Sequence, residues 1–537
     1  MPDYIKYFET ETEFNDERNN NYYEPWVSYT QSNSAVTYNK TEYEKLIETP
    51  LTFEITAPGT IYWKANNSSY TCTIEYRKND GAWTNLTSTT GGTTLSVVSG
   101  DTVQFRGNNA QYATAPSIYN GFSGTTCGFK VNGNIMSLVN STGFSGETTL
   151  QSAFTFTSLL RNCTGLTDAS RLVLPATSLT ESCYRYMFGN TKITQAPKLP
   201  ATTLASDCYQ NTFNGCTSLT TAPALPATTL AGGCYEYMFR LCTSLTTAPE
   251  LPATTLAHVC YSRMFGGCTS LTTAPALPAT TLADSCYYAM FYGCTSLTTA
   301  PELPATTLAD NCYNYMFGGC TSLTRAPSSI GASATIMAAS ACSYMFSGCT
   351  NLTTAPELPA TTLANNCYEG MFDSCTSLTE APELPATTLA ERCYEYMFRL
   401  CTSLTTVPVL LATTLTGRCY YAMFYGCTSL TTAPELPATT LANKCYQAMF
   451  YGCTSLTTAP ELPATVLVNS CYESIFEGCT NLNYIKCLAT DISATNCTAD
   501  WVSNVASTGT FVKDPNMSSW ATGANGIPTD WTVRDAN

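Results

Sequence analysis

Hydrophobic and polar positions recur along most of this chain with a period of 26 residues. The clearest repeat spans residues 282–308 and reads L-A-D-S-C-Y-Y-A-M-F-Y-G-C-T-S-L-T-T-A-P-E-L-P-A-T-T-L. Its first cysteine returns in steps of 26 from Cys208 to Cys312 and again from Cys367 to Cys497. We count twelve units with the Cys-Tyr-x-x-Met-Phe core or a variant of it, since the units at Cys208 and Cys471 lack the methionine and the unit at Cys342 is shifted. A fixed period of this length predicts a stacked array, in which each repeat buries its hydrophobic face against its neighbours.

The first half of each repeat has an amphipathic pattern. We number positions from the first cysteine, which is position 0. The near-invariant Cys, Tyr, Met, Phe and Cys stand at positions 0, 1, 4, 5 and 8, and positions -2, -1, 2, 3, 6 and 7 vary between repeats. At about 100° per residue, the two sets occupy separate arcs of a helical wheel. This separation predicts one short α-helix per repeat, buried on its Cys–Met–Phe–Cys side.

The second half of each repeat, T-S-L-T-T-A-P-E-L-P-A-T-T-L, predicts extended structure. Two prolines three residues apart exclude a helix. Leucine and alanine among β-favouring threonines indicate a short strand followed by an extended return. The predicted fold class is therefore α+β, a leucine-rich-repeat-type solenoid with one short strand and one short helix per 26-residue repeat.

One repeat breaks the period between Cys312 and Cys342. Three residues are inserted there, and the cysteine shifts by one place relative to Phe346. The insertion predicts a bulged loop. Two explanations stay open: drift within a duplicated array, or a contact loop or bend.

Residues 50–149, before the array, have the alternating pattern of β-strands. Phe53 and Ile55 alternate with polar residues, as do Val103 and Phe105. Turn signals lie at residues 79–81, Asn-Asp-Gly, and at residues 99–101, Ser-Gly-Asp. Short strands at this spacing predict an Ig-like β-sandwich.

The two ends of the chain differ from the array in composition. Residues 1–49 are rich in tyrosine, asparagine and acids, and we interpret them as an N-terminal attachment module. The array itself covers residues 150–497. Residues 498–537 carry Trp501, Trp520 and Trp531 among turn residues and are interpreted as a C-terminal cap.

Charge and hydropathy narrow the partners. The formal net charge is -15, and only 12% of residues are charged. An acidic protein repels phosphate, so we expect no nucleic-acid partner and no binding to anionic membranes. The longest apolar runs are too short for a membrane-spanning helix, and the acidic first residues do not resemble a secretion signal. We therefore expect synthesis in the cytoplasm without membrane insertion.

The sequence offers little catalytic or metal-binding chemistry. His258 is the single histidine, and no nucleophile elbow, phosphate loop or dinucleotide fingerprint is present. The cysteines lack the short spacing of zinc knuckles, and both cysteines of a repeat fall on its buried side. We expect structural cysteine ladders, no metal, no cofactor and no enzyme activity. Paired acids for glycoside hydrolysis leave no local signature, so that alternative stays open.

The variable face of the predicted helix is the candidate contact surface, because tyrosine and arginine often anchor interfaces. Pairs such as Tyr288 with Tyr292 would lie on one helical face. An ordinary amphipathic surface is the alternative. The candidates are Tyr237, Arg240, Arg263, Tyr288, Tyr292, Tyr315, Tyr396, Arg399, Tyr421, Tyr425 and Tyr451.

A column of glutamates recurs in the Pro-Glu-Leu-Pro element. We interpret it as a solvent-exposed edge, with a cation site or a dock for a basic partner as the alternative. The column comprises Glu250, Glu302, Glu357, Glu383, Glu435 and Glu461.

The motif C-Y-x-x-M-F-x-G-C-T-S-L-T-T-A-P resembles the BspA-like leucine-rich repeat, whose usual form has an Ala-Phe-x-x-Cys-x-x-Leu core. Here the repeat is about three residues longer and carries a second cysteine and a Pro-x-Leu-Pro element. The opening K-Y-F-E-T-E-T-E-F-N with P-W-V-S-Y-T is similar to proteins of gut Bacteroidales and their tailed phages.

That resemblance implies a virion surface protein, either a fibre or a head-decoration protein. Its N-terminal module would contact other virion proteins, and its repeats would contact a host surface protein or glycan. The alternative is a BspA-like adhesin on a bacterial cell surface. Assembly into a homo-oligomer is left open.

Overall fold

The computed structural model describes residues 5–7, 27–30, 35–38, 40–331, 335–517 and 520–537. Two compact units make up the chain: Met1–Leu230 with Leu241–Glu250, and Ala231–Arg240 with Leu251–Asn537. The predicted module at residues 1–49 lies largely outside the described residues. Its described part contains the short strands β1 (Ile5–Tyr7), β2 (Val27–Thr30) and β3 (Ala35–Tyr38), in the sheet order β1-β3-β2, and helix α2 (Lys40–Ile47).

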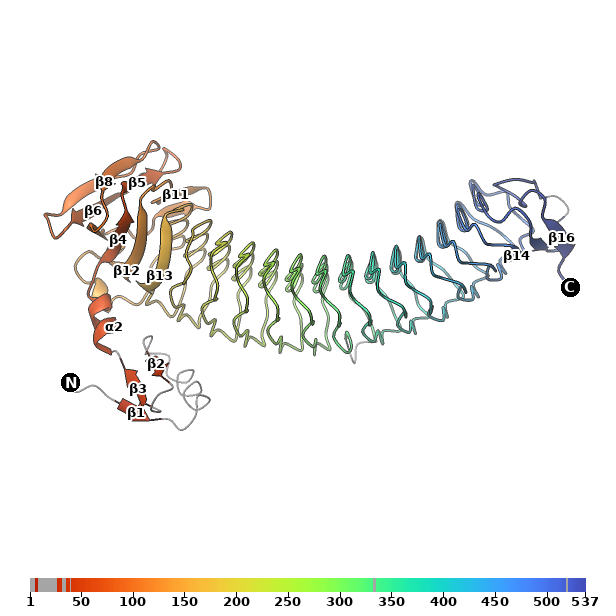
Figure 1. The fold of residues 1–537 in the computed structure, drawn as a ribbon, viewed down its shortest axis with the longest axis horizontal. Helices are drawn as coiled ribbons and strands as arrows, with labels where there is room; N and C mark the ends of the chain where they lie inside the picture. The colour runs from red at the N-terminus through yellow and green to blue at the C-terminus, as the bar shows by residue number, and fades with distance from the viewer. Residues whose placement is uncertain (1–4, 8–26, 31–34, 39, 332–334, 518–519) are drawn as a thin grey trace. The chain divides into compact units, whose positions relative to one another are not determined.

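Two β-sheets follow α2 (Figure 1). The first has the strand order β13-β12-β4-β9-β6-β7 and the second β10-β11-β5-β8. All pairs are antiparallel except β12 with β13, which run parallel. The strands are β4 (Leu51–Ala57), β5 (Gly59–Ala65), β6 (Thr73–Lys78), β7 (Thr84–Thr87), β8 (Thr93–Val97), β9 (Thr102–Arg106), β10 (Ala113–Ala115), β11 (Ile118–Gly121), β12 (Gly128–Asn134) and β13 (Leu166–Val173).

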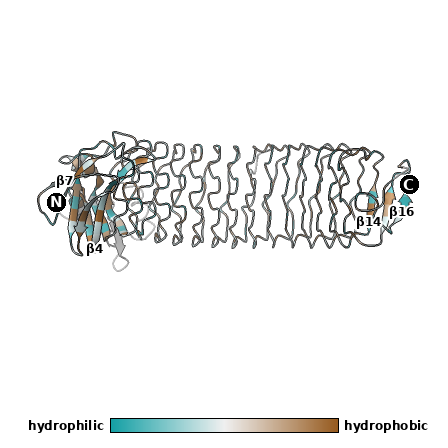
Figure 2. Ribbon diagram, turned by 90° about the horizontal axis from the view of Figure 1, so that it is seen from above, coloured by the Kyte–Doolittle hydropathy of each residue, from teal (hydrophilic) through white to brown (hydrophobic). Residues whose placement is uncertain are grey.

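Aromatic side chains fill the space between these sheets. Phe53 of β4 stacks on Phe129 of β12 with ring centroids 4.4 Å apart, and Phe122 contacts Phe53 and Trp63 of β5. Both hydrophobic and hydrophilic residues occur along the strands around β4 and β7 (Figure 2), as expected for sheets with one buried face. Asn79 and Asp80 have the positive φ of a tight hairpin turn between β6 and β7. The immunoglobulin-type assignment of these sheets stays a prediction.

The first half of each repeat is not an α-helix. In residues 285–294, every second N–H group, from Ser285 to Gly293, donates to a carbonyl of the next repeat at 2.8–3.1 Å. The intervening N–H groups, from Cys286 to Cys294, close tight turns onto the carbonyl three residues earlier at 3.0–3.2 Å. We call residues 285–294 and their equivalents in the other repeats the turn ribbon. Figure 1 shows successive turns side by side.

The prediction of one helix per repeat was therefore wrong, and the spacing of the repeats explains why. The rings of Phe265, Phe291 and Phe317 follow one another at centroid distances of 5.6 Å. Packed α-helices need about 8–10 Å between their axes, so a helix in every repeat would not fit. An α-helix also satisfies its interior N–H groups internally, whereas half of those in the turn ribbon bind the neighbouring repeat.

The turn ribbon has a period of four residues. Positive φ angles recur at positions -1, 3 and 7, with 54° at Ser285, 49° at Ala289 and 72° at Gly293. Positions 0, 4 and 8 consequently share one side, where Cys286, Met290 and Cys294 are fully buried. The predicted set of buried residues is thus correct, although the backbone that buries them differs from a helix.

The second half of each repeat holds single bridging residues in place of the predicted strand. Parallel bridges join equivalent residues at three places, as in Thr299 with Arg325, Leu303 with Ile330, and Thr281 with Thr307. Between β13 and β14, the described residues contain only these single bridges and no strand of greater length. The prolines of the Pro-x-Leu-Pro element explain this difference, because they cannot donate to a ladder.

The repeat with the insertion is shifted by one residue. Tyr313 donates its N–H group to the carbonyl of Ala341, so Ala341 takes position 0 and Cys342 takes the position of a tyrosine. The predicted slip of the cysteine is confirmed. The predicted bulge falls on residues 332–334, which lie outside the described residues.

Parallel strands β14 (Tyr484–Cys487), β15 (Thr510–Lys513) and β16 (Thr532–Asp535) end the chain. Trp501 is buried and stacks on Tyr472 at 6.5 Å and on Trp520 at 5.5 Å. Tyr472 is the last tyrosine at position 1 of the repeats, and the ring of Trp501 covers it.

Candidate contact surface

The predicted contact residues all lie on the turn ribbon, at positions 2, 3 and 6. Tyr292 is the most exposed of them at 51%, and the others are half-buried. Because no helix forms, Tyr288 and Tyr292 are not stacked on a helical face as predicted. Instead, most of their ring and charge contacts join neighbouring repeats.

Arg263 lies between two of the predicted tyrosines. Its guanidinium donates to the hydroxyl of Tyr237 at 2.9 Å and to that of Tyr288 at 3.3 Å. The same guanidinium carbon lies 5.6 and 5.0 Å from the centroids of these two rings. Arg240 also lies over Tyr237, at 5.8 Å. Cation–π and hydrogen-bond contacts therefore fix these side chains across three repeats.

Tyr292, Tyr315 and Tyr344 form a second group. Tyr292 meets Tyr315 edge to face at 6.2 Å, and Tyr315 stacks on Tyr344 at 4.9 Å. Tyr344 was not among the predicted residues because its repeat is shifted. Aligning that repeat on Phe346 would have placed Tyr344 at position 3, beside Tyr315.

An ion pair holds Arg399 in place. Its guanidinium donates to both carboxylate oxygens of Asp373, at 3.0 and 2.6 Å, and Asp373 is buried. The guanidinium also lies 4.8 Å from the ring centroid of Tyr396, which meets Tyr421 edge to face at 5.3 Å. Such a two-pronged pair orients Arg399 more strongly than a single contact would.

Glu395 is a buried carboxylate beside this group. Only 3% of the residue is exposed, and burial raises its pKa to about 7 although Arg418 and Arg392 lie 3.7 Å away. Within the described residues, its Oε2 atom accepts no hydrogen bond. Arg418 lies over Tyr421 at 4.9 Å. The sequence prediction missed Glu395 and Arg418, although both stand at variable positions of the ribbon.

Tyr425 and Tyr451 form a stacked pair on neighbouring repeats. They stack face to face, with centroids 4.5 Å apart and planes 1° from parallel. Stacking covers one face of each of these two rings, whereas Tyr292 with Tyr315 and Tyr396 with Tyr421 meet edge to face.

The cysteines and the histidine lie as follows. All of the cysteines are free and buried, and burial raises the pKa of Cys312 and Cys320 to about 12. Over the described ranges, no group of three or more His, Cys, Asp or Glu side chains is arranged to hold a metal ion. His258 is exposed and lies 2.9 Å from a carboxylate oxygen of Asp284.

We call residues 295–308 and their equivalents in the other repeats the return segments, and the glutamate column lies on them. Ser328 donates two hydrogen bonds to Glu302, which hold the pKa of that carboxyl below its usual value. Glu461 pairs with Lys486 at 2.9 Å. Glu357, Glu383 and Glu435 are exposed, as the interpretation of a solvent edge requires.

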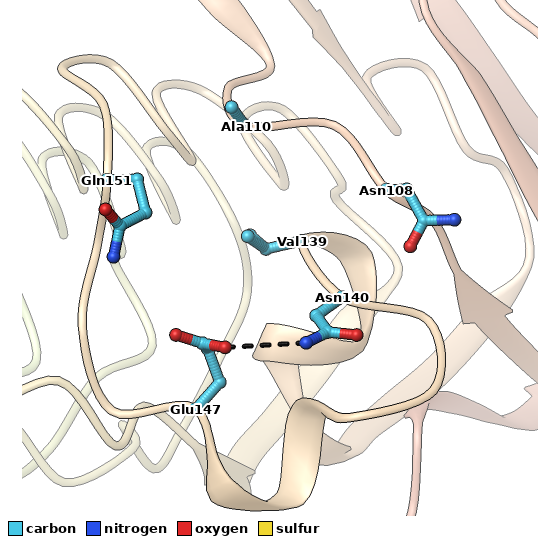
Figure 3. A pocket seen from close by; sticks show the side chains of 6 residues that line it. All are labelled: Asn108, Ala110, Val139, Asn140, Glu147 and Gln151. Carbon is cyan, nitrogen blue, oxygen red and sulfur yellow. Dashed lines mark hydrogen bonds between the residues drawn. The ribbon is translucent and has the colours of Figure 1, made fainter.

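A shallow recess of 290 Å³ lies in the first unit, lined by amides and one acid (Figure 3). Asn140 donates to Glu147 across it at 3.5 Å. It brings together none of the predicted contact residues. Its lining consists of Asn108, Ala110, Val139, Asn140, Glu147 and Gln151.

Comparison with protein families places the repeats. Residues 234–334, 335–433 and 411–499 match the BspA type leucine rich repeat region, a model with six copies of the repeat. The chain is a BspA-like leucine-rich-repeat protein. Searches of curated proteins and of solved structures give no match. BspA-like repeats belong to a non-enzymatic, adhesion-type family. Within the described residues, the structure contains no helix long and apolar enough to cross a membrane.

Proposed function

We propose that this BspA-like protein is a non-enzymatic surface protein that binds its partner through the tyrosines and arginines of the turn ribbon. The observation that carries the proposal is the fixed row of Tyr and Arg side chains at positions 2, 3 and 6. Arg263 and Arg399 are held by neighbours on adjacent repeats. Because these side chains are already ordered, little conformational entropy is lost when a partner binds.

A partner protein or the hydroxyl groups of a host glycan would fit this surface. Outward tyrosine hydroxyls and guanidinium groups donate hydrogen bonds, and tyrosine and arginine are enriched among the residues that dominate binding energy.

We further propose that the protein belongs to a tailed-phage virion, as a fibre or head-decoration protein made in the host cytoplasm. Residues 1–49 would attach it to other virion proteins, residues 50–149 would form the Ig-like spacer, and residues 498–537 would cap the repeats. The similarity of the opening segment to phage proteins supports this proposal. The match to BspA-type repeats equally favours the alternative, an adhesin on a bacterial cell surface.

Location separates these two functions. Antibodies against the repeats should detect the protein in gradient-purified virions and label their surface in electron micrographs. Recovery with the bacterial envelope, and never with particles, would support the adhesin instead.

The contact surface is tested by changing Tyr288 and Tyr421 to Ala in the full chain. We expect the double variant to lose about tenfold or more in binding to whole cells of gut Bacteroidales, with an unchanged melting temperature. Thr254→Ala, an exposed change on a return segment, is the matched control. Unchanged binding by the double variant would reduce this face to an ordinary polar surface.

A further inference from the structure

A second surface lies on the return segments, where one repeat departs from all its neighbours. The repeats that begin at Cys367 and Cys419 read Ala-Pro-Glu-Leu-Pro-Ala, and the repeat between them reads Val-Pro-Val-Leu-Leu-Ala at residues 407–412. Val407 replaces alanine, Val409 replaces glutamate and Leu411 replaces proline. All three changes are to larger or more apolar side chains.

The three replacements face outward together. Val409 is 69% exposed and Leu411 is 48% exposed, and Val407 is half-buried. The alternate residues Leu410 and Ala412 are buried in the array. Extended backbone places every second side chain on the same side, so Val407, Val409 and Leu411 form one outward apolar row.

Unpaired acids border this row. The bridge between Glu380 and Thr406 sets the register of the preceding return segment, so Glu383 stands one repeat before Val409. Glu435 stands one repeat after Val409. Within the described residues, Glu380, Glu383 and Glu435 are exposed and form no ion pair, and residues 376–390, 402–416 and 428–442 contain no lysine or arginine.

We propose that this apolar row and its acidic border dock a protein segment that presents apolar side chains flanked by lysine or arginine. The apolar contacts would remove Val409 and Leu411 from water, and the carboxylates would pair with the basic flanks, which gives the site its selectivity. A second copy of this chain fits poorly, because a twofold contact across the row would bring glutamates against glutamates. The carboxylates equally repel an anionic lipid surface. The site is separate from the turn ribbon and does not depend on where the protein resides.

A defined peptide tests the proposal with the full-length chain. The probe is a fluorescein-labelled peptide, Gly-Lys-Lys-Leu-Val-Leu-Lys-Lys-Gly, with two controls in which serine replaces its apolar residues or glutamate replaces its lysines. Fluorescence anisotropy in low salt should show binding of the probe that is about tenfold tighter than that of either control. Raising the salt concentration should weaken it, because exposed charges are screened.

The decisive variant restores a regular repeat without changing the charge, by Val407→Ala, Val409→Ala and Leu411→Pro. It copies the Ala-Pro-Ala-Leu-Pro-Ala of residues 222–227, so it should fold with an unchanged melting temperature and lose probe binding by about tenfold or more. Glu383→Gln with Glu435→Gln should remove most of the salt dependence. Val466→Thr, which changes another exposed apolar residue to the threonine of other repeats, is the matched control and should bind as the wild type does.

Three outcomes would overturn the proposal. They are no measurable binding of the probe to the wild-type chain, equal binding by the restored variant, and equal binding of the glutamate peptide. Self-association of the wild-type chain in sedimentation that the restored variant abolishes would assign the row to contacts between copies instead. Each of these results leaves the Tyr288 and Tyr421 experiment on whole cells unaffected.

Discussion

The thiol of Cys294 donates a hydrogen bond to the backbone carbonyl of Phe265 in the preceding repeat, with sulfur and oxygen 3.1 Å apart. The same bond joins Cys320 to Phe291 at 3.1 Å. The second cysteine of a repeat is therefore a link between repeats as well as a small buried side chain. Within the described residues, Cys286, at position 0, makes no such bond to another repeat.

This difference predicts unequal costs for removing the two cysteines. Cys294→Ala loses both packing and the hydrogen bond, so we expect it to destabilise the chain by about 2 kcal/mol. Cys286→Ala should cost about 1 kcal/mol, because packing is lost but no bond to another repeat. Cys294→Ser keeps a donor and should lie between Cys294→Ala and the wild type. Unfolding midpoints in denaturant measure the order, and equal costs for the two alanine variants would contradict it.

The burial of the thiols predicts that they do not react with thiol reagents in the folded protein. The chain has 28 cysteines, all free and buried, and burial raises the pKa of thiols such as Cys367 to about 12. Because the thiolate is the reactive form, a thiol reagent at neutral pH should leave the native protein unmodified. The same reagent in guanidinium should titrate all 28 thiols. Rapid reaction of the native protein would contradict this prediction, because it would show that the folded repeats open and expose their thiols.

Glu395 predicts a dependence of stability on pH. Its pKa is raised from 4.5 to about 7 by burial, so the folded state binds the proton more tightly than the unfolded state does. Stability should consequently fall as the pH rises from about 4.5 to about 7, by up to about 3 kcal/mol. Glu395→Gln removes the charge and should stabilise the chain at pH 8 while changing little near pH 4.

Thermal unfolding of the wild type and Glu395→Gln at the two pH values measures this effect. The groups around Glu395 are Arg392, Arg418, Glu369 and Glu391. Glu391→Gln, a change at an exposed neighbour, is the control and should have a small effect at both pH values. A lower melting temperature of Glu395→Gln at pH 8 would contradict the prediction.

The sign of the stability change caused by substituting a glycine distinguishes the turn ribbon from a helix. Gly293 has a φ of 72°, and an added Cβ would lie 4.0 Å from Gly267, which is ordinary contact. Gly293→Ala should therefore destabilise the chain by about 1 kcal/mol through backbone strain alone. In an α-helix, the same change would stabilise by a similar amount. Ala289→Gly, at a φ of 49°, should cost little, because relief of strain offsets the lost methyl group.

The sequence predicted the buried residues of the repeats because they recur without regard to backbone type. Positions 0, 1, 4, 5 and 8 separate from the variable positions on a wheel of 100° per residue, and they separate equally well at four residues per turn. That ambiguity produced the helix prediction. Glycine recurs at position 7, as at Gly267, Gly293 and Gly319, and it marks the left-handed backbone that excludes a helix.

The candidate surface was predicted residue by residue, but its contacts were not. The variable tyrosines and arginines indicated which face differs between repeats. The pairing of Arg399 with Asp373 and the burial of Glu395 depend on which side chains of adjacent repeats meet. Tyr344 was missed because a one-residue shift conceals its position until the hydrogen bond from Tyr313 to Ala341 sets the register.

The backbone hydrogen bonds between turn ribbons run in one direction, so the two ends of the array differ in the groups that they present. N–H groups of each turn ribbon donate to carbonyls of the repeat that follows it, as Tyr287 does to Cys312. During synthesis, the N–H groups of the newest repeat thus lack these acceptors until the following repeat has been made. At the opposite end, Tyr112 and Phe122 supply donors to the carbonyls of Thr155 and Leu159. Each repeat therefore depends on the repeat that follows it for its acceptors, whereas residues of the preceding β-sheets supply donors to carbonyls of residues 155 and 159.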